Sequence, residues 1–146
     1  MKPKKPKLQD QADLFRSRLD QILDRKHPLF MLASQIDWST FDTKFGSLYA
    51  DKGRPALPTR LMVGLHYLKH AFDESDESVV ARLLENPYWQ YFCGFEFFIH
   101  RLPLDPSSLV RWRKRIGPKE MVQLLGETLE TAKRGGHLTE QHMERV

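Results

Sequence analysis

The sequence is poor in the residues and runs that define secreted, membrane-bound and disulfide-linked proteins. Its 146 residues include one cysteine, Cys93, so a disulfide within the chain is excluded and a reducing compartment is indicated. No apolar run approaches the roughly 20 residues that span a bilayer. The lysine-rich start lacks the apolar core of a secretory signal. We therefore expect a cytoplasmic protein with no membrane partner.

Catalytic signatures are also scarce. The chain has no glycine-rich phosphate loop, no Gly-x-Ser-x-Gly elbow and no Cys-x-x-Cys pair. Cys93 follows Tyr91 and Phe92, and these apolar neighbours disfavour a reactive thiolate. We therefore expect Cys93 to be a core thiol rather than a nucleophile.

The pattern of apolar residues predicts helices and no sheet. No alternating stretch is long enough for a strand, and no internal repeat is present. Apolar residues instead recur every three or four positions, as on amphipathic helices. The predicted fold is all-α, a compact multi-helix domain over residues 8–134. A basic arm at 1–7 precedes it, and residues 135–146 are expected to begin a linker to another domain.

The predicted helices have recognisable starts and ends. The first carries a narrow apolar seam and ends near His27-Pro28. Packing of this seam on its own domain is favoured over pairing with a second chain, because two heptads do not establish a coiled coil. The seam residues are Leu8, Ala12, Phe15, Leu19 and Ile22. Further helices are expected after Asp37, Pro58-Thr59, Ser75 and Asn86-Pro87, and a final helix from Pro118 to Arg134.

The net charge of +4 is distributed unevenly. Lysines alternate with prolines in residues 1–7, which predicts a mobile cationic arm whose Lys4 and Lys5 can follow phosphates. Four acids lie within 73–77, where helix capping and solvation explain them. The stretch 101–119 then carries six cations against one acid, Asp105. Two basic regions therefore flank a neutral to acidic middle.

Residues 105–117 predict a helix with two chemically different faces. Asp105 suits an N-cap, Pro106 the first helical position, and Gly117 a C-terminal stop. One stripe of the helix is apolar, and the opposite side is polar and cationic. The apolar stripe consists of Leu109, Trp112 and Ile116, and the polar side of Ser107, Arg111, Lys114 and Arg115.

A helix of this kind can pack its apolar stripe on a helical scaffold and place its polar side in a DNA major groove. We therefore predict a DNA-recognition helix in a helix-turn-helix-like unit, because the Asn86-Pro87 joint leaves almost no loop between two helices. The DNA-binding candidates are Ser107, Arg111, Arg113, Lys114, Arg115 and Lys119, with Lys4 and Lys5 of the arm. Arg113 lies at the flank of the stripe, where it can reach a phosphate or a protein acid. The alternative is a surface helix with solvated arginines.

Two histidines superficially match the spacing of metal ligands. His66 and His70 are four residues apart, and Glu74 follows four further on. No glutamate lies between the histidines, and a zinc site would need a fourth ligand and partners that orient it. We therefore interpret both histidines as hydrogen-bonded or solvent-facing, and expect no metal and no other cofactor in this chain.

Three segments, in this order and spacing, carry a resemblance to a known family. They are GRPALPTRLMVGLHYLKH (53–70), ENPYWQYFCG (85–94) and LPLDPSSLVRWRKRIG (102–117). The chain resembles, from about Phe15 to Thr131, the N-terminal domain of the insertion sequence 5 family of DDE-type bacterial transposases. The resemblance implies a helical domain that recognises the terminal inverted repeats of an insertion element. Its implied partner is the double-stranded DNA of the element ends.

The resemblance also implies a missing part. In relatives an RNase H-like domain with a DDE triad and two divalent metals follows the helical domain, whereas this sequence stops at Val146. We therefore expect a DNA-binding part of a transposase that is not itself an enzyme. Truncation, a frameshift or deliberate cutting would each produce such a chain, with the divalent metals confined to the missing domain.

Other functions remain open. The chain could inhibit transposition by pairing with a second copy or with a full-length transposase, or by competing for its DNA sites. The seam of the first helix is the feature that motivates such pairing. An autonomous nuclease that uses His66, His70 and Glu74 is a further alternative, and it rests on spacing alone.

Overall fold

The computed structural model describes residues 17–49, 57–101 and 103–135. Across these residues the chain is α-helical without any strand, which confirms the predicted all-α fold. The helices are α2 (Leu19–Ile22), α3 (Pro28–Gln35), α4 (Trp38–Tyr49), α5 (Thr59–Ala71), α6 (Asp76–Glu85), α7 (Pro87–Phe92), α8 (Pro106–Ile116) and α9 (Pro118–Gly135). Within the described ranges, no helix combines the length and the apolar character needed to cross a membrane.

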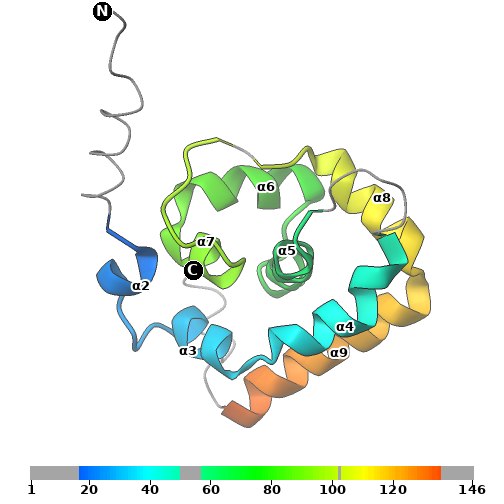
Figure 1. Cartoon of the computed structure of the whole chain (residues 1–146), viewed down its shortest axis with the longest axis horizontal. Helices are drawn as coiled ribbons and strands as arrows, with labels where there is room; N and C mark the ends of the chain where they lie inside the picture. The colour runs from blue at the N-terminus through cyan, green and yellow to red at the C-terminus, as the bar shows by residue number, and fades with distance from the viewer. Residues whose placement is uncertain (1–16, 50–56, 102, 136–146) are drawn as a thin grey trace, which may run out of the picture.

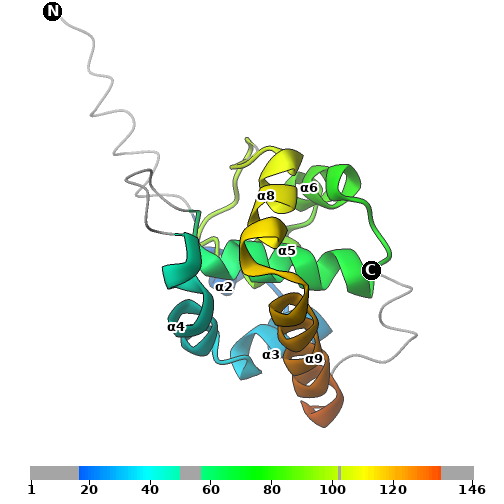
Figure 2. The same ribbon diagram turned by 90° about the vertical axis from the view of Figure 1, so that its right-hand side faces the viewer.

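Helix α5 is the central element of the fold. Figure 1 views it end-on with the other helices around it, and Figure 2 shows it crossing the middle of the domain. Nine of its 13 residues are buried, on all sides of the helix, as expected for a helix that the core encloses. It contacts α4, α6, α8 and α9. The helix predicted to open at Pro58-Thr59 is therefore confirmed, and its burial extends far beyond the stripe that the spacing of Leu61, Leu65, Leu68 and Phe72 predicts.

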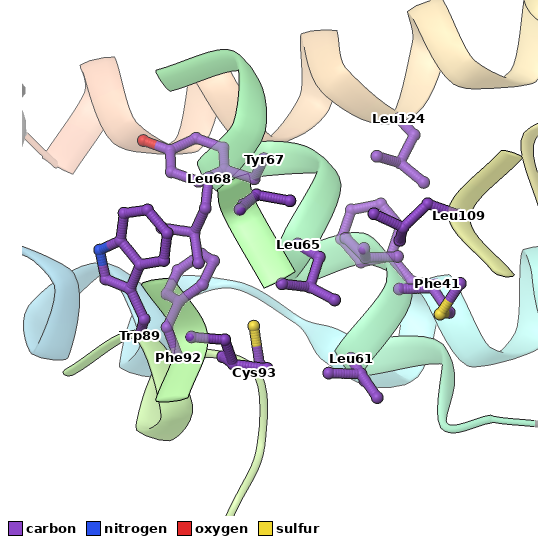
Figure 3. Packing of buried hydrophobic residues seen from close by; sticks show 14 of the residues in the cluster. Phe41, Leu61, Leu65, Tyr67, Leu68, Trp89, Phe92, Cys93, Leu109 and Leu124 are labelled. Carbon is purple, nitrogen blue, oxygen red and sulfur yellow. The ribbon is translucent and has the colours of Figure 1, made fainter. Parts of the chain in front are cut away.

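The core around α5 combines aromatic and aliphatic side chains from several helices (Figure 3). Trp89 and Phe92 of α7 are fully buried there. Where α5 passes the end of α7, a Cβ atom on Gly64 would lie only 2.8 Å from the Sγ atom of Cys93. Glycine therefore permits the close approach of the two helices. Cys93 is buried, as predicted for a core thiol, and burial raises the pKa of this thiol well above its ordinary range.

The N-terminal part of the described chain differs from the prediction. Helix α2 ends at Ile22, and Leu23 has an extended backbone, so a continuous helix to His27-Pro28 is wrong over its last turn. A separate helix, α3, begins at Pro28, and the sequence prediction missed it. The Nδ1 atom of His27 accepts a hydrogen bond from the backbone N–H of Leu29 at 3.1 Å. Histidine thus caps this helix in place of the usual Ser, Thr, Asp or Asn.

The two described residues of the predicted seam have different environments. Leu19 is fully buried in a small cluster with Leu23 and Phe30, which packs on α7 and on the segment that follows it. Ile22 is 59% exposed. Leu19 therefore packs within its own domain, as the favoured interpretation held, and these two residues do not form one apolar seam. The remaining seam residues, Leu8, Ala12 and Phe15, lie outside the described residues.

The other predicted helix boundaries agree with the structure to within one residue. Ser75 Oγ accepts a hydrogen bond from the backbone N–H of Ser78 at 3.0 Å, and Asn86 Oδ1 accepts one from Tyr88 at 2.9 Å. Asn86 alone separates α6 from α7, which confirms the tight joint. Helix α9 ends at Gly135, the residue at which the linker was predicted to begin.

Candidate nucleic-acid interface

Helix α8 forms over the residues that its capping signals predicted. Asp105 Oδ1 accepts a hydrogen bond from the backbone N–H of Ser107 at 3.1 Å, and Pro106 occupies the first helical position. The helix ends at Gly117, whose φ of +97° is a conformation that other residues adopt only with strain. Helix α9 begins at the next residue, Pro118, so a single glycine connects the two helices.

One face of α8 is packed into the core. Leu109, Trp112 and Ile116 are buried, as the apolar stripe predicted. The Trp112 ring lies 5.0 Å from the ring of His66 on α5 and 6.3 Å from that of Phe45 on α4, measured between centroids. Helix α8 also contacts α6 and α9. Packing on four helices fixes both the position and the rotation of α8.

The opposite face of α8 is exposed. Ser107 and Arg111 lie on it near the start of the helix. The Arg111 guanidinium donates hydrogen bonds to the hydroxyl oxygens of Ser107, at 3.1 Å, and Ser108, at 3.2 Å. Both acceptors are neutral, so these bonds orient the guanidinium without neutralising its charge. Among the described residues, the structure gives Arg111 no ion pair with a carboxylate.

Further exposed cations lie in the last turn of α8 and in the first turn of α9. Lys114 and Arg115 are exposed on α8, and Lys119 is exposed in the first turn of α9. The structure therefore brings together five of the predicted DNA-binding residues on one helix and the turn that follows it. Lys4 and Lys5, the predicted contacts from the arm, lie outside the described residues.

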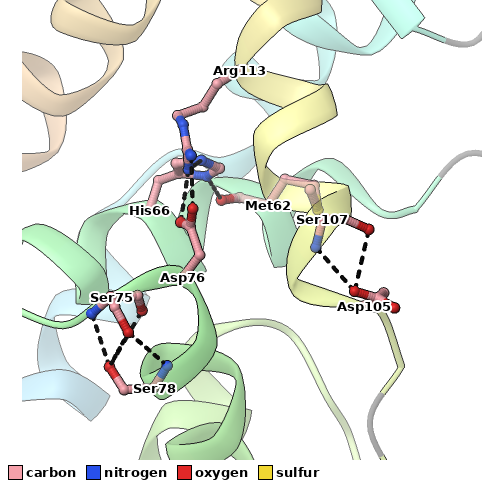
Figure 4. A network of polar contacts seen from close by, with 8 residues as sticks. All are labelled: Met62, His66, Ser75, Asp76, Ser78, Asp105, Ser107 and Arg113. Carbon is pink, nitrogen blue, oxygen red and sulfur yellow. Dashed lines mark hydrogen bonds and ion pairs between the residues drawn. The ribbon is translucent and has the colours of Figure 1, made fainter.

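Arg113 is placed differently from the other cations of α8. Its Nη1 and Nη2 atoms each donate to one carboxylate oxygen of Asp76 at 2.8 Å, a bidentate ion pair (Figure 4). The hydrogen bonds from Arg113 hold the pKa of Asp76 below its ordinary value, and the same bonds raise the pKa of Arg113. Of the two predicted partners of Arg113, a phosphate or a protein acid, the structure shows the acid. The interpretation of Asp76 as only a solvated first-turn acid is wrong, because it anchors α8 to α6.

His66 completes this polar contact from the side of α5. It is 1% exposed, and its Nδ1 atom lies 2.7 Å from the backbone oxygen of Met62, which can only accept. Nδ1 therefore carries the proton, and Nε2 accepts from Arg113 Nη1 at 3.3 Å. Burial lowers the pKa of His66 to about 4, so the ring is neutral at pH 7. His66, Arg113 and Asp76 together connect α5, α8 and α6.

Two of the three residues with metal-ligand spacing are held by protein partners. Both ring nitrogens of His66 are used, and Glu74 forms an ion pair with Arg82 at 2.8 Å. His70 is exposed. The histidines are therefore hydrogen-bonded and solvent-facing respectively, as interpreted from the sequence. In the part of the chain that the structure describes, no three side chains of His, Cys, Asp or Glu gather as metal ligands.

Sequence reasoning missed the connection between α5, α6 and α8. Asp76 and Arg113 are 37 positions apart, and no local pattern relates them. One weak signal was available, since Arg113 lies between the apolar stripe and the exposed face and is a long cation at the edge of a packed surface.

The fold and site together define an all-α domain that presents one cationic helix face on a packed scaffold. Residues 17–115 match the family described as transposase domain (DUF772), so the chain belongs to this transposase-domain family. A protein of Rhizobium meliloti described as uncharacterized protein ORF8 in nfe locus is 52% identical over 146 residues. The match covers all of this chain and 70% of that relative. No solved structure matches the chain.

Proposed function

We propose that this chain is the DNA-recognition domain of an insertion sequence 5 family transposase, and that α8 binds the terminal inverted repeats of the element. The observation that carries the proposal is the division of α8 into a packed apolar face and an exposed cationic face. Because the core holds one face, the other has a fixed orientation toward solvent. Membership of a transposase-domain family supports DNA as the polyanion that this face binds. The tight joint at Asn86 connects α6 to α7 and does not include α8, although α8 contacts α6. The helix-turn-helix-like arrangement is therefore a part of the proposal that the joint alone does not establish.

The exposed cations set the expected salt dependence of binding. Each phosphate that a cation neutralises contributes about −0.9 to the slope of log affinity against log salt concentration. Contacts from Arg111, Lys114, Arg115 and Lys119 therefore give a slope of about −3.6. Contacts from Lys4 and Lys5 would bring it to about −5.4. An arginine that turns toward a guanine edge adds sequence preference in place of a phosphate contact.

Arg113 has a positioning role in this proposal. Its guanidinium is bound by Asp76 on α6 and by His66 on α5, so it fixes the side of α8 that lies next to the exposed face. Ser107 remains a candidate contact, and because its hydroxyl donates to Asp105 Oδ1 at 3.2 Å, it would have to exchange this acceptor for a phosphate oxygen.

Fluorescence anisotropy on labelled duplexes tests the proposal. The protein is expected to bind element ends at least about tenfold more tightly than a scrambled duplex of equal composition. The double variant Arg111→Ala/Lys114→Ala should weaken binding and reduce the salt slope by about two. The matched control is Lys26→Ala, which removes an exposed cation that precedes α3, and it should change neither quantity. Equal binding to both duplexes, or binding insensitive to salt, would contradict recognition by α8.

The predicted arm is tested separately. The double variant Lys4→Ala/Lys5→Ala should lower the salt slope by about two and leave the preference for element ends unchanged, because phosphate contacts carry little sequence information. A lost preference with an unchanged slope would assign base contacts to the arm instead.

We also propose that this chain binds DNA without cutting it. The partners of His66 and Glu74 leave neither side chain arranged as a metal ligand. An element-end duplex should therefore stay intact in the presence of the protein and Mg²⁺. Cleavage that the His70→Ala substitution abolishes would instead support the nuclease alternative.

A further inference from the structure

Val110 is an apolar residue on the cationic face of α8. It is 36% exposed, whereas its neighbour Leu109 is fully buried. At 100° per residue, Val110 lies beside Ser107 and Lys114, three positions before it and four after it, and Arg111 is the next residue. In the described residues, the other large apolar side chains that are exposed are Ile22 and Val122, and neither lies on α8.

Folding explains only part of the choice of valine at this position. Valine is a weaker helix former than alanine, leucine, lysine or glutamine, because its branched Cβ restricts the side chain. Val110 is 36% exposed, so the larger part of the residue already gains from burial within the domain and the remainder faces solvent. A long polar side chain would serve the helix at least as well, so the exposed part of the isopropyl group is the feature that a contact outside the domain would explain.

We propose that Val110 reads the 5-methyl group of a thymine in the major groove. This inference rests on the proposed function and assigns one residue of α8 to one base type. Thymine is the base that presents a methyl group in the major groove, and small apolar side chains recognise it by contact. Arg111 and Lys114 lie on the same face as Val110, so cations that hold the phosphates or guanine edges bring the isopropyl group to the bases.

Val110 also borders an apolar groove of about 680 Å³ between α8 and α9, which Met121, Val122 and Leu125 line as well. A protein partner is therefore the competing occupant of this surface. Charge favours DNA, because Lys114 forms part of the groove and Arg111 and Arg115 are exposed on the same helix. A polyanion complements these cations, whereas a second copy of this chain would place the same cations opposite one another.

The inference is tested in two steps. Selection from a randomised duplex pool first identifies the preferred sequence. The wild-type protein should enrich a motif with at least one fixed thymine. Each thymine of the selected duplex is then replaced singly by deoxyuridine, which removes only the methyl group. Loss of one apolar contact of methyl size corresponds to about a fourfold weaker affinity. We expect this loss at one or two positions for the wild type, and none at the same positions for Val110→Ala.

The control is Val122→Ala, which removes an equally apolar and more exposed side chain of the same groove. It should respond to deoxyuridine as the wild type does. Equal losses for wild type and Val110→Ala would overturn the inference, as would a selected motif without a thymine contact. Self-association in sedimentation that both Val110→Ala and Val122→Ala weaken, with unchanged base preference, would also overturn it and assign the groove to a protein. If the wild type enriches no motif at all, the proposed function itself fails.

Discussion

Gly64 shows how strongly a single residue constrains the centre of this domain. A Cβ atom at this position would lie 2.8 Å from Cys93 Sγ and 3.2 Å from Cys93 Cα. The second contact is with backbone, which cannot rotate away as a side chain can. Helices α5 and α7 would therefore have to separate to accept any larger residue.

We expect Gly64→Ala to lower the free energy of unfolding by about 1–3 kcal/mol, because it overpacks the core. Gly126→Ala is the matched control, since a Cβ there meets no atom within 4 Å. It replaces glycine inside an exposed part of α9 and should stabilise the protein by up to about 1 kcal/mol. Urea unfolding of both variants measures the difference. A stabilising Gly64→Ala substitution would show that the close approach is not rigid.

Individual residues also show which features of the site could be predicted from the sequence and which could not. The burial of Leu109, Trp112 and Ile116 followed from periodicity, because a helix with this stripe can hide it in one way only. The partner of Arg113 did not follow, since an ion pair between distant segments depends on how helices pack and not on local spacing.

At the scale of the element, α8 combines a hydrophobic attachment that fixes its position and rotation with one ion pair that reinforces this rotation. The bidentate Asp76–Arg113 pair lies between the packed and the exposed faces, with about a third or less of each side chain exposed. Rotation of α8 would have to break this pair as well as displace the buried apolar stripe. The pair therefore helps the packed stripe to specify which side chains of α8 point outward.

We expect Asp76→Asn to lower the free energy of unfolding by about 1–3 kcal/mol, because Arg113 would lose its charged partner. It should also reduce the preference for element ends while leaving the salt slope unchanged. Glu74→Gln is the matched control, since it breaks an ion pair of the same length, with Arg82, that does not include α8. Preference lost equally in both variants would contradict a positioning role for Asp76 and indicate general destabilisation.

Helix boundaries were the most predictable feature at this scale. Caps at Ser75, Asn86 and Asp105 act through bonds to the next few backbone N–H groups, so a short sequence window contains all the information. The prediction was wrong around His27-Pro28, where the local signals are unusual. Its cap is a histidine, and Pro28 was read as the end of one helix when it begins another.

At the scale of the whole molecule, the stability of the domain is coupled to a buried neutral histidine. The pKa of His66 is about 4 in the folded protein, below its ordinary value of 6.5, because burial disfavours the charged ring. Arg113, Asp76 and Lys69 are the charged groups that act on it. Between pH 6.5 and about 4 the unfolded chain binds a proton that the folded chain excludes, so stability falls as the pH is lowered.

Unfolding by urea at pH 7 and at pH 4 measures this effect. The stability that His66 contributes is fully present above pH 6.5 and decreases by up to about 3 kcal/mol by pH 4. His66→Gln should remove most of this pH dependence, because glutamine does not titrate. His70→Gln is the control: burial also lowers the pKa of His70, but the variant keeps His66 and should therefore retain most of the pH dependence. If the free energy of unfolding of His66→Gln fell as much between pH 7 and pH 4 as that of the wild type, other groups would cause the acid sensitivity. The Asp76 carboxylate contributes only at lower pH, since its pKa lies below the ordinary 3.8.

The arrangement of the helices is the part of the fold that the sequence did not predict. The spacing of Leu61, Leu65, Leu68 and Phe72 predicts one packed side of α5, whereas the structure encloses this helix on all sides. Enclosure depends on contacts with α4, α6, α8 and α9, which lie far apart in the chain. An apolar stripe therefore sets a lower limit on how much of a helix is buried, but it does not predict where the helix lies in the core.

The two faces of α8 have one more consequence, for how related domains can diverge. Exchange of the side chains at 107, 111, 114 and 115 leaves the packing of Leu109, Trp112 and Ile116 untouched. Descendants of such a domain can thus acquire new target sequences by a few surface substitutions, each compatible with the ancestral architecture. Divergence of specificity and preservation of the scaffold proceed independently along the same eleven-residue helix.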